Sequence, residues 1–260
     1  MPKLVHQWNP ADYVRHSQGQ ERFARELLTL LNPQPYESVL DVGCGDGRMT
    51  FEIAKLARQV VGIDRSPEMV AFASRNFPER KFHNLSFRTA DAAALPFRGE
   101  FEVVYSSAVL HWVQDHESAL AGIARSLRSG GRCLLQMSGK GNSDEVIRIF
   151  EDAGVRPRQF TYAFFSPDEY RPKLEKAGLT ASSVELIPRD MVHANRAAFT
   201  GWLWHECCSG FNKKADPHRT GWVRPPPTPK RPWKMLNVKL LPDCSLSSNP
   251  RNRPWKPWQL

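Results

Sequence analysis

The stretch VLDVGCGDGR, residues 39–48, joins an apolar run to a dense glycine turn. Residues 38–42 form a short segment rich in β-branched and apolar side chains, as in a buried parallel strand. Residues 48–57 then repeat apolar side chains at helical spacing. Glycine lacks Cβ, so the chain can turn sharply there and a ligand can approach the backbone. The order strand, glycine turn, helix is typical of a nucleotide-type site at the carboxyl edge of a sheet. The three glycines stand at alternate positions, Gly43, Gly45 and Gly47.

The spacing of these glycines narrows the class of ligand. It follows G-x-G-x-G, whereas a loop that binds the pyrophosphate of a dinucleotide reads G-x-G-x-x-G. Asp41 directly precedes the turn, and its charge would repel phosphate but suits a ligand that carries an ammonium and a sulfonium. The alternative is an ordinary tight turn between a strand and a helix, because a glycine pattern alone is weak evidence.

Carboxylates also follow the next two predicted strands. Asp64 ends the strand over residues 59–64, where a carboxylate can accept both ribose hydroxyls of an adenosine. Asp91 follows a strand at residues 85–88 and can accept a hydrogen bond from an adenine amino group. Any one of these acids is more often a solvated loop residue or a helix cap. Asp64 and Asp91 together with Asp41, three acids in register beside a glycine turn, indicate a nucleoside site.

The rest of the pattern predicts a doubly wound α/β fold with a mostly parallel sheet and helices on both faces. Serine followed by proline marks two helix starts, at Ser66 and Ser166. Further strands are expected at residues 101–106, 132–137 and 182–188, and further helices late in residues 8–31 and at residues 143–153 and 194–204.

With these motifs in this order, the chain resembles class I S-adenosylmethionine-dependent methyltransferases. The matching motifs are residues 39–47, 60–69, 90–92 and 101–112. Within that superfamily it most resembles trans-aconitate 2-methyltransferases and their small-molecule relatives, which include juvenile hormone acid methyltransferases. The closer match rests on residues 8–13, 62–69 and 110–112, and the resemblance spans roughly residues 6–203. It implies S-adenosyl-L-methionine as the cofactor.

The resemblance and the strand positions together imply a set of cofactor contacts. The backbone of Gly43, Cys44 and Gly45 passes the methionine portion, and Asp41 orders the loop or a water near the ammonium. Asp64 binds the ribose and Arg65 flanks the adenine. Asp91 binds the adenine amino group, while the Ala92 amide faces a ring nitrogen. Backbone carbonyls of Ser106 and Ser107 reach the ammonium.

The acceptor site is expected just after the fourth strand. His111 and Trp112 stand there, and the juvenile hormone acid relatives implicate such a pair together with a glutamine that matches Gln20. A core role for Trp112 and a surface role for His111 are the alternatives. Trp8 and Tyr13 are candidates for a lid over the cofactor, or for an apolar staple on the first helix.

Charge and composition divide the 260 residues into two parts. Residues 1–204 form the expected methyltransferase domain, with a net charge of only +1. Residues 205–260 hold 11 Lys or Arg against 3 Asp or Glu, and ten prolines, which predicts an irregular or disordered basic tail. Residues 235–241 are the only apolar run in that tail, and residues 205–233 and 242–260 are expected to be irregular. Relatives supply a final strand from this region, so the fifth and sixth strands are expected to lack a neighbour and the domain to be destabilised.

Three functions remain open at this point. The first is methylation of a small carboxylic acid, which needs no general base because the acceptor is already ionised at pH 7. The second is an RNA or protein methyltransferase that docks through the basic tail, and the third is an impaired cofactor-binding homologue. The five scattered cysteines show no metal-binding spacing, and no apolar stretch is long enough to span a bilayer. These features, with no apolar signal sequence, favour a cytoplasmic protein with reduced thiols.

Overall fold

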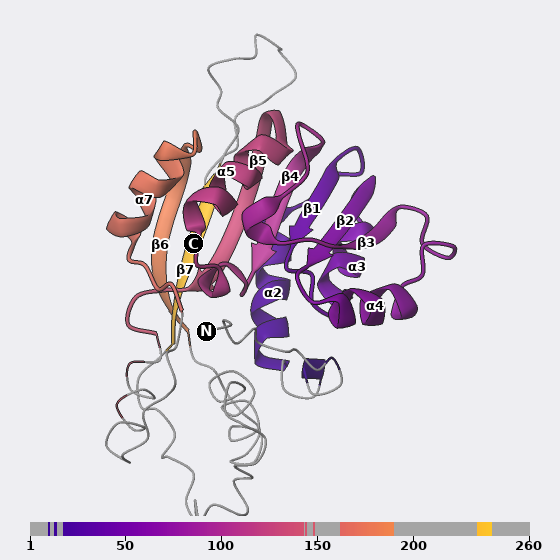
Figure 1. Ribbon diagram of the computed structural model, residues 1–260, viewed down its shortest axis with the longest axis horizontal. Coiled ribbons are helices and arrows are strands. Elements are labelled where there is room, and N and C mark those ends of the chain that lie inside the picture. Colours follow the sequence, from indigo (N-terminus) through magenta and orange to yellow (C-terminus); the bar gives the residue numbers. More distant parts are fainter. Residues whose placement is uncertain are drawn as a thin grey trace, which may run out of the picture.

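A seven-stranded sheet organises the part of the chain that the computed structural model describes: residues 10, 13–14, 18–142, 144, 148, 162–189 and 233–240 (Figure 1). The spatial order of its strands is β3-β2-β1-β4-β5-β7-β6. The strands are β1 (Ser38–Val42), β2 (Gln59–Asp64), β3 (Leu85–Thr89), β4 (Phe101–Ser107), β5 (Leu127–Ser138), β6 (Ala181–Arg189) and β7 (Trp233–Leu240).

The first five strands are parallel, and β1 pairs with both β2 and β4. The direction of winding therefore reverses between β1 and β4, where open α/β sheets place their ligands, beyond the carboxyl ends of the strands. Asp41 lies opposite Gly62 on one side and Tyr105 on the other. The doubly wound α/β prediction is confirmed.

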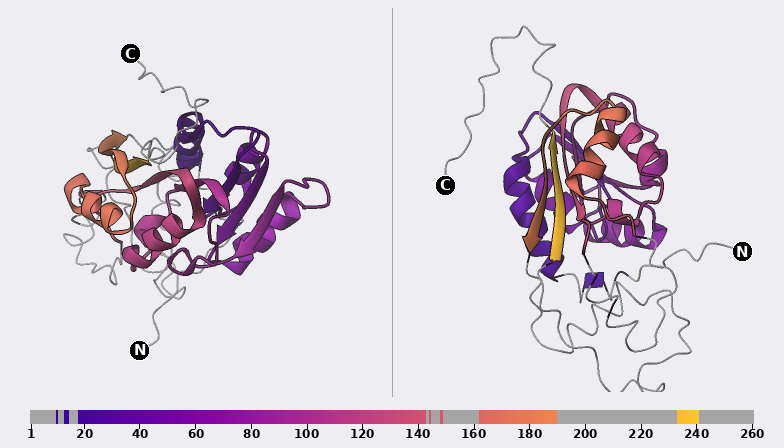
Figure 2. Two further views of the ribbon diagram at one scale, coloured as in Figure 1. Left: turned by 90° about the horizontal axis from the view of Figure 1, so that it is seen from above. Right: turned by 90° about the vertical axis from the view of Figure 1, so that its left-hand side faces the viewer.

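Helices cover both faces of the sheet (Figure 2). Helices α2 (Gln18–Leu31) and α3 (Arg48–Ala54) bury Leu27, Leu31 and Ile53 in one core cluster with inward side chains of β1 to β5. Helices α5 (His116–Ser126) and α7 (Pro167–Lys176) bury Leu120, Ile123 and Leu174 in the other. Helix α4 (Pro67–Asn76) packs beside β2 and β3. None of the helices in this described part is long and apolar enough to cross a bilayer.

Most predicted elements form where they were expected. The strands at 38–42 and 59–64 match β1 and β2, and the serine caps of α4 and α7 are confirmed, with a full capping box at Ser166. Helix α3 ends at Ala54, three residues earlier than predicted, because Asn84 Nδ2 donates to the carbonyls of Ala54 and Ala57 at 2.7 and 3.3 Å. The predicted helices at 143–153 and 194–204 lie largely outside the described residues.

The basic tail supplies the strand that the sequence analysis expected to be lost. Strand β7 lies between β5 and β6 and is antiparallel to both (Figure 1). Its Val238 is fully buried in the core beneath α5 and α7, which explains how a short apolar run fills this position. The prediction that β5 and β6 lack a neighbour is therefore wrong, as is the assignment of Trp233 to irregular chain. Residues 205–232 and 241–260 lie outside the described residues.

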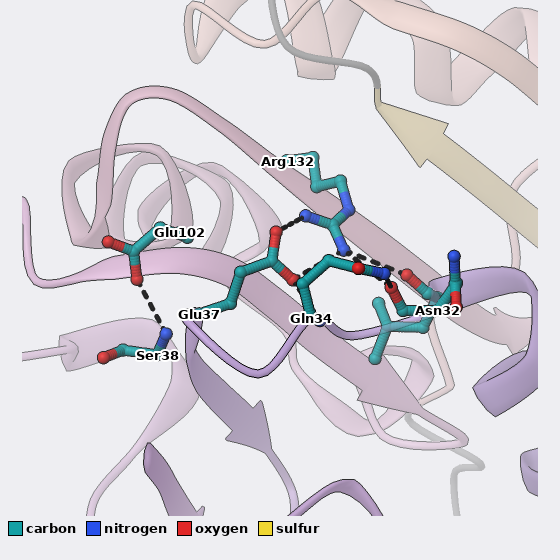
Figure 3. A network of polar contacts seen from close by, with 7 residues as sticks. Asn32, Gln34, Glu37, Ser38, Glu102 and Arg132 are labelled. Carbon is teal, nitrogen blue, oxygen red and sulfur yellow. Dashed lines mark hydrogen bonds and ion pairs between the residues drawn. The ribbon is translucent and has the colours of Figure 1, made fainter. Parts of the chain in front are cut away.

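A polar network ties the opposite, amino edge of the sheet together (Figure 3). The carboxylate of Glu37, before β1, forms a bidentate ion pair with the Arg132 guanidinium of β5. Arg132 Nη2 also donates to the Leu31 carbonyl at 3.0 Å, which satisfies one of the last carbonyls of α2. On the neighbouring strand, Glu102 accepts the Ser38 N–H at 2.7 Å. This network fixes α2, β1 and β5 relative to one another, far from the carboxyl edge.

Candidate active site at the carboxyl edge of the sheet

Two glycines of the turn are required by packing. Gly43 has φ +83°, and a Cβ there would stand 2.0 Å from Val109 Cγ2, in the chain that follows β4. Gly47 has φ +82°, and a Cβ there would stand 2.8 Å from Ala73 of α4 and from Phe87 of β3. The backbone N–H groups of Gly43 and Cys44 both donate to the Ile63 carbonyl at 2.8 Å. The turn is therefore held closely against β2, β3 and α4.

Gly45 is different, because a Cβ at this position would not clash with its neighbours. With φ +54°, a Cβ there would meet only Met69 Cε at 3.6 Å and the Tyr13 ring at 3.7 Å, which are ordinary contacts. Its N–H donates to Asp64 Oδ2 at 3.0 Å. Tyr13 thus lies over the glycine turn, where a lid residue was expected, while Trp8 lies outside the described residues.

Asp41 is a buried carboxyl group below this turn, with only 2% of its surface exposed. Thr50 Oγ1, in the first turns of α3, donates to its Oδ2 at 2.7 Å. Burial raises the pKa of Asp41 to about 7, Thr50 opposes that shift, and the nearby Asp64 carboxylate adds to it. Asp41 therefore orders the start of α3, and it is a carboxyl group that a nearby cation would readily ionise.

The carboxylate of Asp64 accepts hydrogen bonds from both the glycine turn and the start of α4. Its Oδ2 accepts the Gly45 N–H, and its Oδ1 accepts the Ser66 N–H at 2.9 Å. Burial raises the pKa of Asp64, and these backbone hydrogen bonds oppose the shift. Each carboxylate oxygen can accept more than one hydrogen bond, so Asp64 keeps the capacity to bind a vicinal diol.

The two residues expected around adenine lie together at the ends of β2 and β3. Arg65 Nε is 3.8 Å from Asp91 Oδ2, and both side chains are exposed. Asp91 Oδ1 also accepts the Ala93 N–H at 2.9 Å, so it caps the short helix η1 (Ala92–Ala94). Ala92 is buried. The cap and the ligand-binding role are compatible, because the second carboxylate oxygen faces Arg65.

The serines at the end of β4 have distinct surroundings. Ser106 is fully buried, and its Oγ donates to the Val42 carbonyl at 2.9 Å, which fixes the end of β4 to the end of β1. Ser107 is partly buried and hydrogen-bonds the Tyr105 side chain. Cys44 is a free, buried thiol whose pKa is raised well above its ordinary value by burial, which argues against a nucleophilic role.

Beyond β4, His111 and Trp112 belong to the short helix η2 (Leu110–Trp112). His111 is 6% exposed, and its Nδ1 accepts the Ser138 N–H at the end of β5 at 3.3 Å. Burial, with the nearby His116, lowers the pKa of His111 to about 3, so the ring is neutral at pH 7. Since Nδ1 is an acceptor, the ring proton lies on Nε2, which is then a donor.

Two further aromatic rings join this pair. Tyr162 and Phe164 stack at 5.1 Å, and Tyr162 meets Trp112 edge-on at 4.7 Å. His111 lies 5.9 and 6.2 Å from the same two rings, and its carbonyl accepts the Ala163 N–H at 2.9 Å. We call His111, Trp112, Tyr162 and Phe164 the aromatic wall. Tyr162 and Phe164 were not among the residues predicted for the site, although their alternate spacing is a signal of an extended segment with one aromatic face.

Gln20, the third acceptor candidate, belongs to α2, whose C-terminal half packs on the sheet. Its side chain lies outside what the structure describes. Within the described residues, no group of three or more His, Cys, Asp or Glu side chains could hold a metal ion. The groups available to a ligand at this edge are instead carboxylates and the backbone of the glycine turn. They fit a ligand with an ammonium, a diol and an aromatic amine, as S-adenosylmethionine has.

Comparison with known proteins agrees with this arrangement. Residues 40–135 match a family described as a methyltransferase domain. An uncharacterized methyltransferase of Schizosaccharomyces pombe is 32% identical over 194 residues, which cover 70% of this chain and 74% of that protein. A trans-aconitate 2-methyltransferase of Deinococcus radiodurans is 36% identical over 132 residues, about half the length of each chain.

Solved structures share the fold. The geranyl diphosphate C-methyltransferase of Streptomyces coelicolor A3(2) superposes with a TM-score of 0.61 at 14% identity, over 86% of this chain and 78% of that one. The methyltransferase-domain match begins within β1 and ends within β5. It therefore covers every candidate cofactor residue and also His111 and Trp112.

Proposed function

Because the chain belongs to the class I S-adenosylmethionine-dependent methyltransferases, we propose that it transfers the methyl group of S-adenosylmethionine to a carboxylate of a small organic acid. The observation that carries the acceptor class is the aromatic wall, with a neutral histidine whose Nε2–H is a donor. Trans-aconitate 2-methyltransferases among the relatives support the same class.

On this proposal the glycine turn and the three strand-end acids hold the cofactor. Asp64 accepts the ribose hydroxyls, Arg65 and Asp91 bracket the adenine with the Ala92 amide, and Asp41 lies toward the ammonium. The backbone of Gly43, Cys44 and Gly45 and the carbonyls of Ser106 and Ser107 line the methionine portion. S-adenosylmethionine supplies an electrophilic methyl group on a sulfonium, so the protein needs to position the two reactants and exclude water.

The acceptor residues then have simple tasks. The Nε2–H of His111 donates to one carboxylate oxygen, which leaves the other oxygen free to attack the methyl group. A neutral imidazole suits this task, because it orients the carboxylate without the strong attraction that a full positive charge would exert on the nucleophile. Trp112 and the other rings of the aromatic wall exclude water from the reacting atoms. On the resemblance to juvenile hormone acid methyltransferases, we propose Gln20 as a further polar contact to the acceptor.

The other functions receive less support. Residues 233–240 form β7 inside the sheet, so this part of the basic tail is not a free arm for docking RNA or protein. The same strand removes the structural reason for expecting an impaired homologue, since β5 and β6 have their neighbour. Residues 233–240 therefore belong to the same sheet as the strands within residues 1–204.

A turnover assay tests the proposal. Purified protein with labelled S-adenosylmethionine is offered trans-aconitate, short dicarboxylic acids and a fatty acid, and also RNA and a protein mixture. We expect base-labile methyl esters from at least one acid. His111→Ala should lower kcat while the Kd for S-adenosylmethionine stays within about twofold, and His83→Ala, at the far edge of the sheet, is the matched control. Methylation of RNA or protein without any ester would contradict the proposal.

A further inference from the structure

The segment that carries half of the aromatic wall has a second face. Tyr162 and Phe164 point to one side, with their rings stacked 9° from parallel. Phe165 is offset by one residue in this extended chain and packs on the other side, against the core beneath α5 and α7. Its ring meets His116 edge-on at 4.8 Å and lies 5.4 Å from the Tyr170 ring. The position of the aromatic wall thus depends on the residues that Phe165 packs against.

Phe165 packs against a buried pair of polar residues, His116 and Tyr170. His116, the first residue of α5, is 3% exposed, and Tyr170 of α7 is fully buried. The Tyr170 hydroxyl lies 3.3 Å from His116 Nδ1, so the two helices share a hydrogen bond beneath Phe165. His116 Nε2 is buried without a hydrogen-bond partner, although the Leu110 carbonyl lies near the ring. Nothing in the proposed chemistry uses this pair.

We propose that His116 and Tyr170 are positioning residues that hold the aromatic wall over the acceptor by supporting Phe165 from below. This inference rests on the proposed function for its consequence in catalysis, but not for its structural content. The hydrogen bond fixes the His116 ring edge-on to Phe165. The Phe165 carbonyl accepts the Lys140 N–H at 2.9 Å, which fixes the segment from its other side.

The charged groups around His116 determine how protonation of its ring at low pH would affect the support of Phe165. Burial and the Lys173 ammonium of α7 lower the pKa of His116 to about 4, while the Asp115 carboxylate before α5 opposes the shift. Lys173 Nζ lies 5.3 Å over the Phe165 ring. His111 is the other nearby histidine, and Cys133 of β5 faces Tyr170, whose pKa burial raises. An imidazolium at position 116 would therefore lie in an apolar pocket beside a second cation, and the support of Phe165 would be lost.

Kinetics of Tyr170→Phe test the catalytic consequence. This change removes one hydroxyl and keeps the ring, and Tyr36→Phe, at an exposed tyrosine before β1, is the matched control. Loss of one neutral hydrogen bond should raise the KM of the acid roughly threefold to tenfold. We expect no change in the Kd for S-adenosylmethionine. His116→Asn, which keeps a polar group near the Nδ1 position, should retain more activity than His116→Ala. An unchanged KM in Tyr170→Phe, or an equal loss of cofactor affinity, would overturn the proposal.

A second readout needs no turnover. With 4-fluorophenylalanine at position 164, the ¹⁹F resonance reports the order of the aromatic wall. It should shift or broaden in Tyr170→Phe, and in the unaltered protein below about pH 5, but not in Tyr36→Phe. If no acid is methylated and the resonance still responds, the proposed function fails while the positioning role stands. An identical resonance in Tyr170→Phe would refute the positioning role itself.

Discussion

Replacing Gly43 and Gly45 separately by alanine distinguishes the glycine that serves the fold from the glycine that serves the cofactor. At Gly43 the new Cβ would lie 2.0 and 2.6 Å from the two γ-carbons of Val109, which is far inside contact distance. At Gly45 the nearest atoms would be 3.6 and 3.7 Å away, on Met69 and Tyr13. Both positions have positive φ, so both variants share the strain of a left-handed alanine.

The free energies follow from these two terms. Left-handed backbone costs an alanine about 1–2 kcal/mol, and overpacking costs about 1–3 kcal/mol or more. Gly45→Ala should therefore lose about 1–2 kcal/mol of unfolding free energy, and Gly43→Ala roughly 2–5 kcal/mol. At about 2–4 °C per kcal/mol for a domain of this size, the second variant should melt clearly below the first.

Urea unfolding and calorimetry with S-adenosylmethionine measure the two effects independently. Gly45→Ala should fold but bind at least roughly tenfold more weakly, a loss of about 1.4 kcal/mol, because its Cβ adds bulk where the backbone of the turn is proposed to approach the cofactor. Adding Val109→Gly to Gly43→Ala should cost less than the sum of the single changes, since the clash is removed. The reasoning fails if Gly45→Ala binds like the unaltered protein, or if Gly43→Ala is no less stable than Gly45→Ala.

Three further outcomes are expected. Asp64→Asn should weaken S-adenosylmethionine binding by about 1.5–3 kcal/mol, and Asp46→Asn, in the same turn, should not; equal Kd values in calorimetry would remove Asp64 from the site. Glu37→Gln should cost about 3 kcal/mol in urea unfolding, because it leaves the Arg132 charge without its carboxylate, whereas no measurable loss would show that the pair is not stabilising. The raised pKa of Asp41, about 7, means that the unfolding free energy of the ligand-free protein declines as the pH rises toward 7. A bound ammonium favours the ionised carboxyl, so cofactor affinity should increase from pH 6 to 8 and flatten in Asp41→Asn, and parallel pH profiles would contradict this.

The candidate cofactor residues could be brought together from the sequence because their signals are local. Asp41, the glycines and Asp64 all lie within one strand-turn-helix-strand unit, so a short window of sequence displays them together. Parallel pairing of β1 with β2 and of β2 with β3 then brings the three strand ends to one edge. The sequence did not reveal that Gly43 and Gly47 face Val109 and Phe87, because those contacts depend on tertiary packing.

The acceptor half was harder for the same reason. Tyr162 and Phe164 contact His111 across about 50 residues of chain, and no local period connects them. Strand β7 was misjudged because proline and basic residues surround it, and composition outweighed the short alternation of Leu236, Val238 and Leu240. A central antiparallel strand draws its stability from neighbours on both sides, so an eight-residue segment needs less intrinsic signal than an edge strand does.

The late strand also connects the tail to the chemistry. Met235 pairs with Ser138, and the Ser138 N–H is the group that sets the tautomer of His111. Pairing between β5 and β7 therefore fixes the backbone that orients His111, the candidate acceptor residue, while the candidate cofactor residues lie on or just after β1 to β4, which do not pair with β7. Changes within residues 233–240 should consequently affect the acceptor before the cofactor. The geometry of the candidate cofactor half thus depends on one contiguous motif, whereas that of the candidate acceptor half depends on the pairing of β7 with β5.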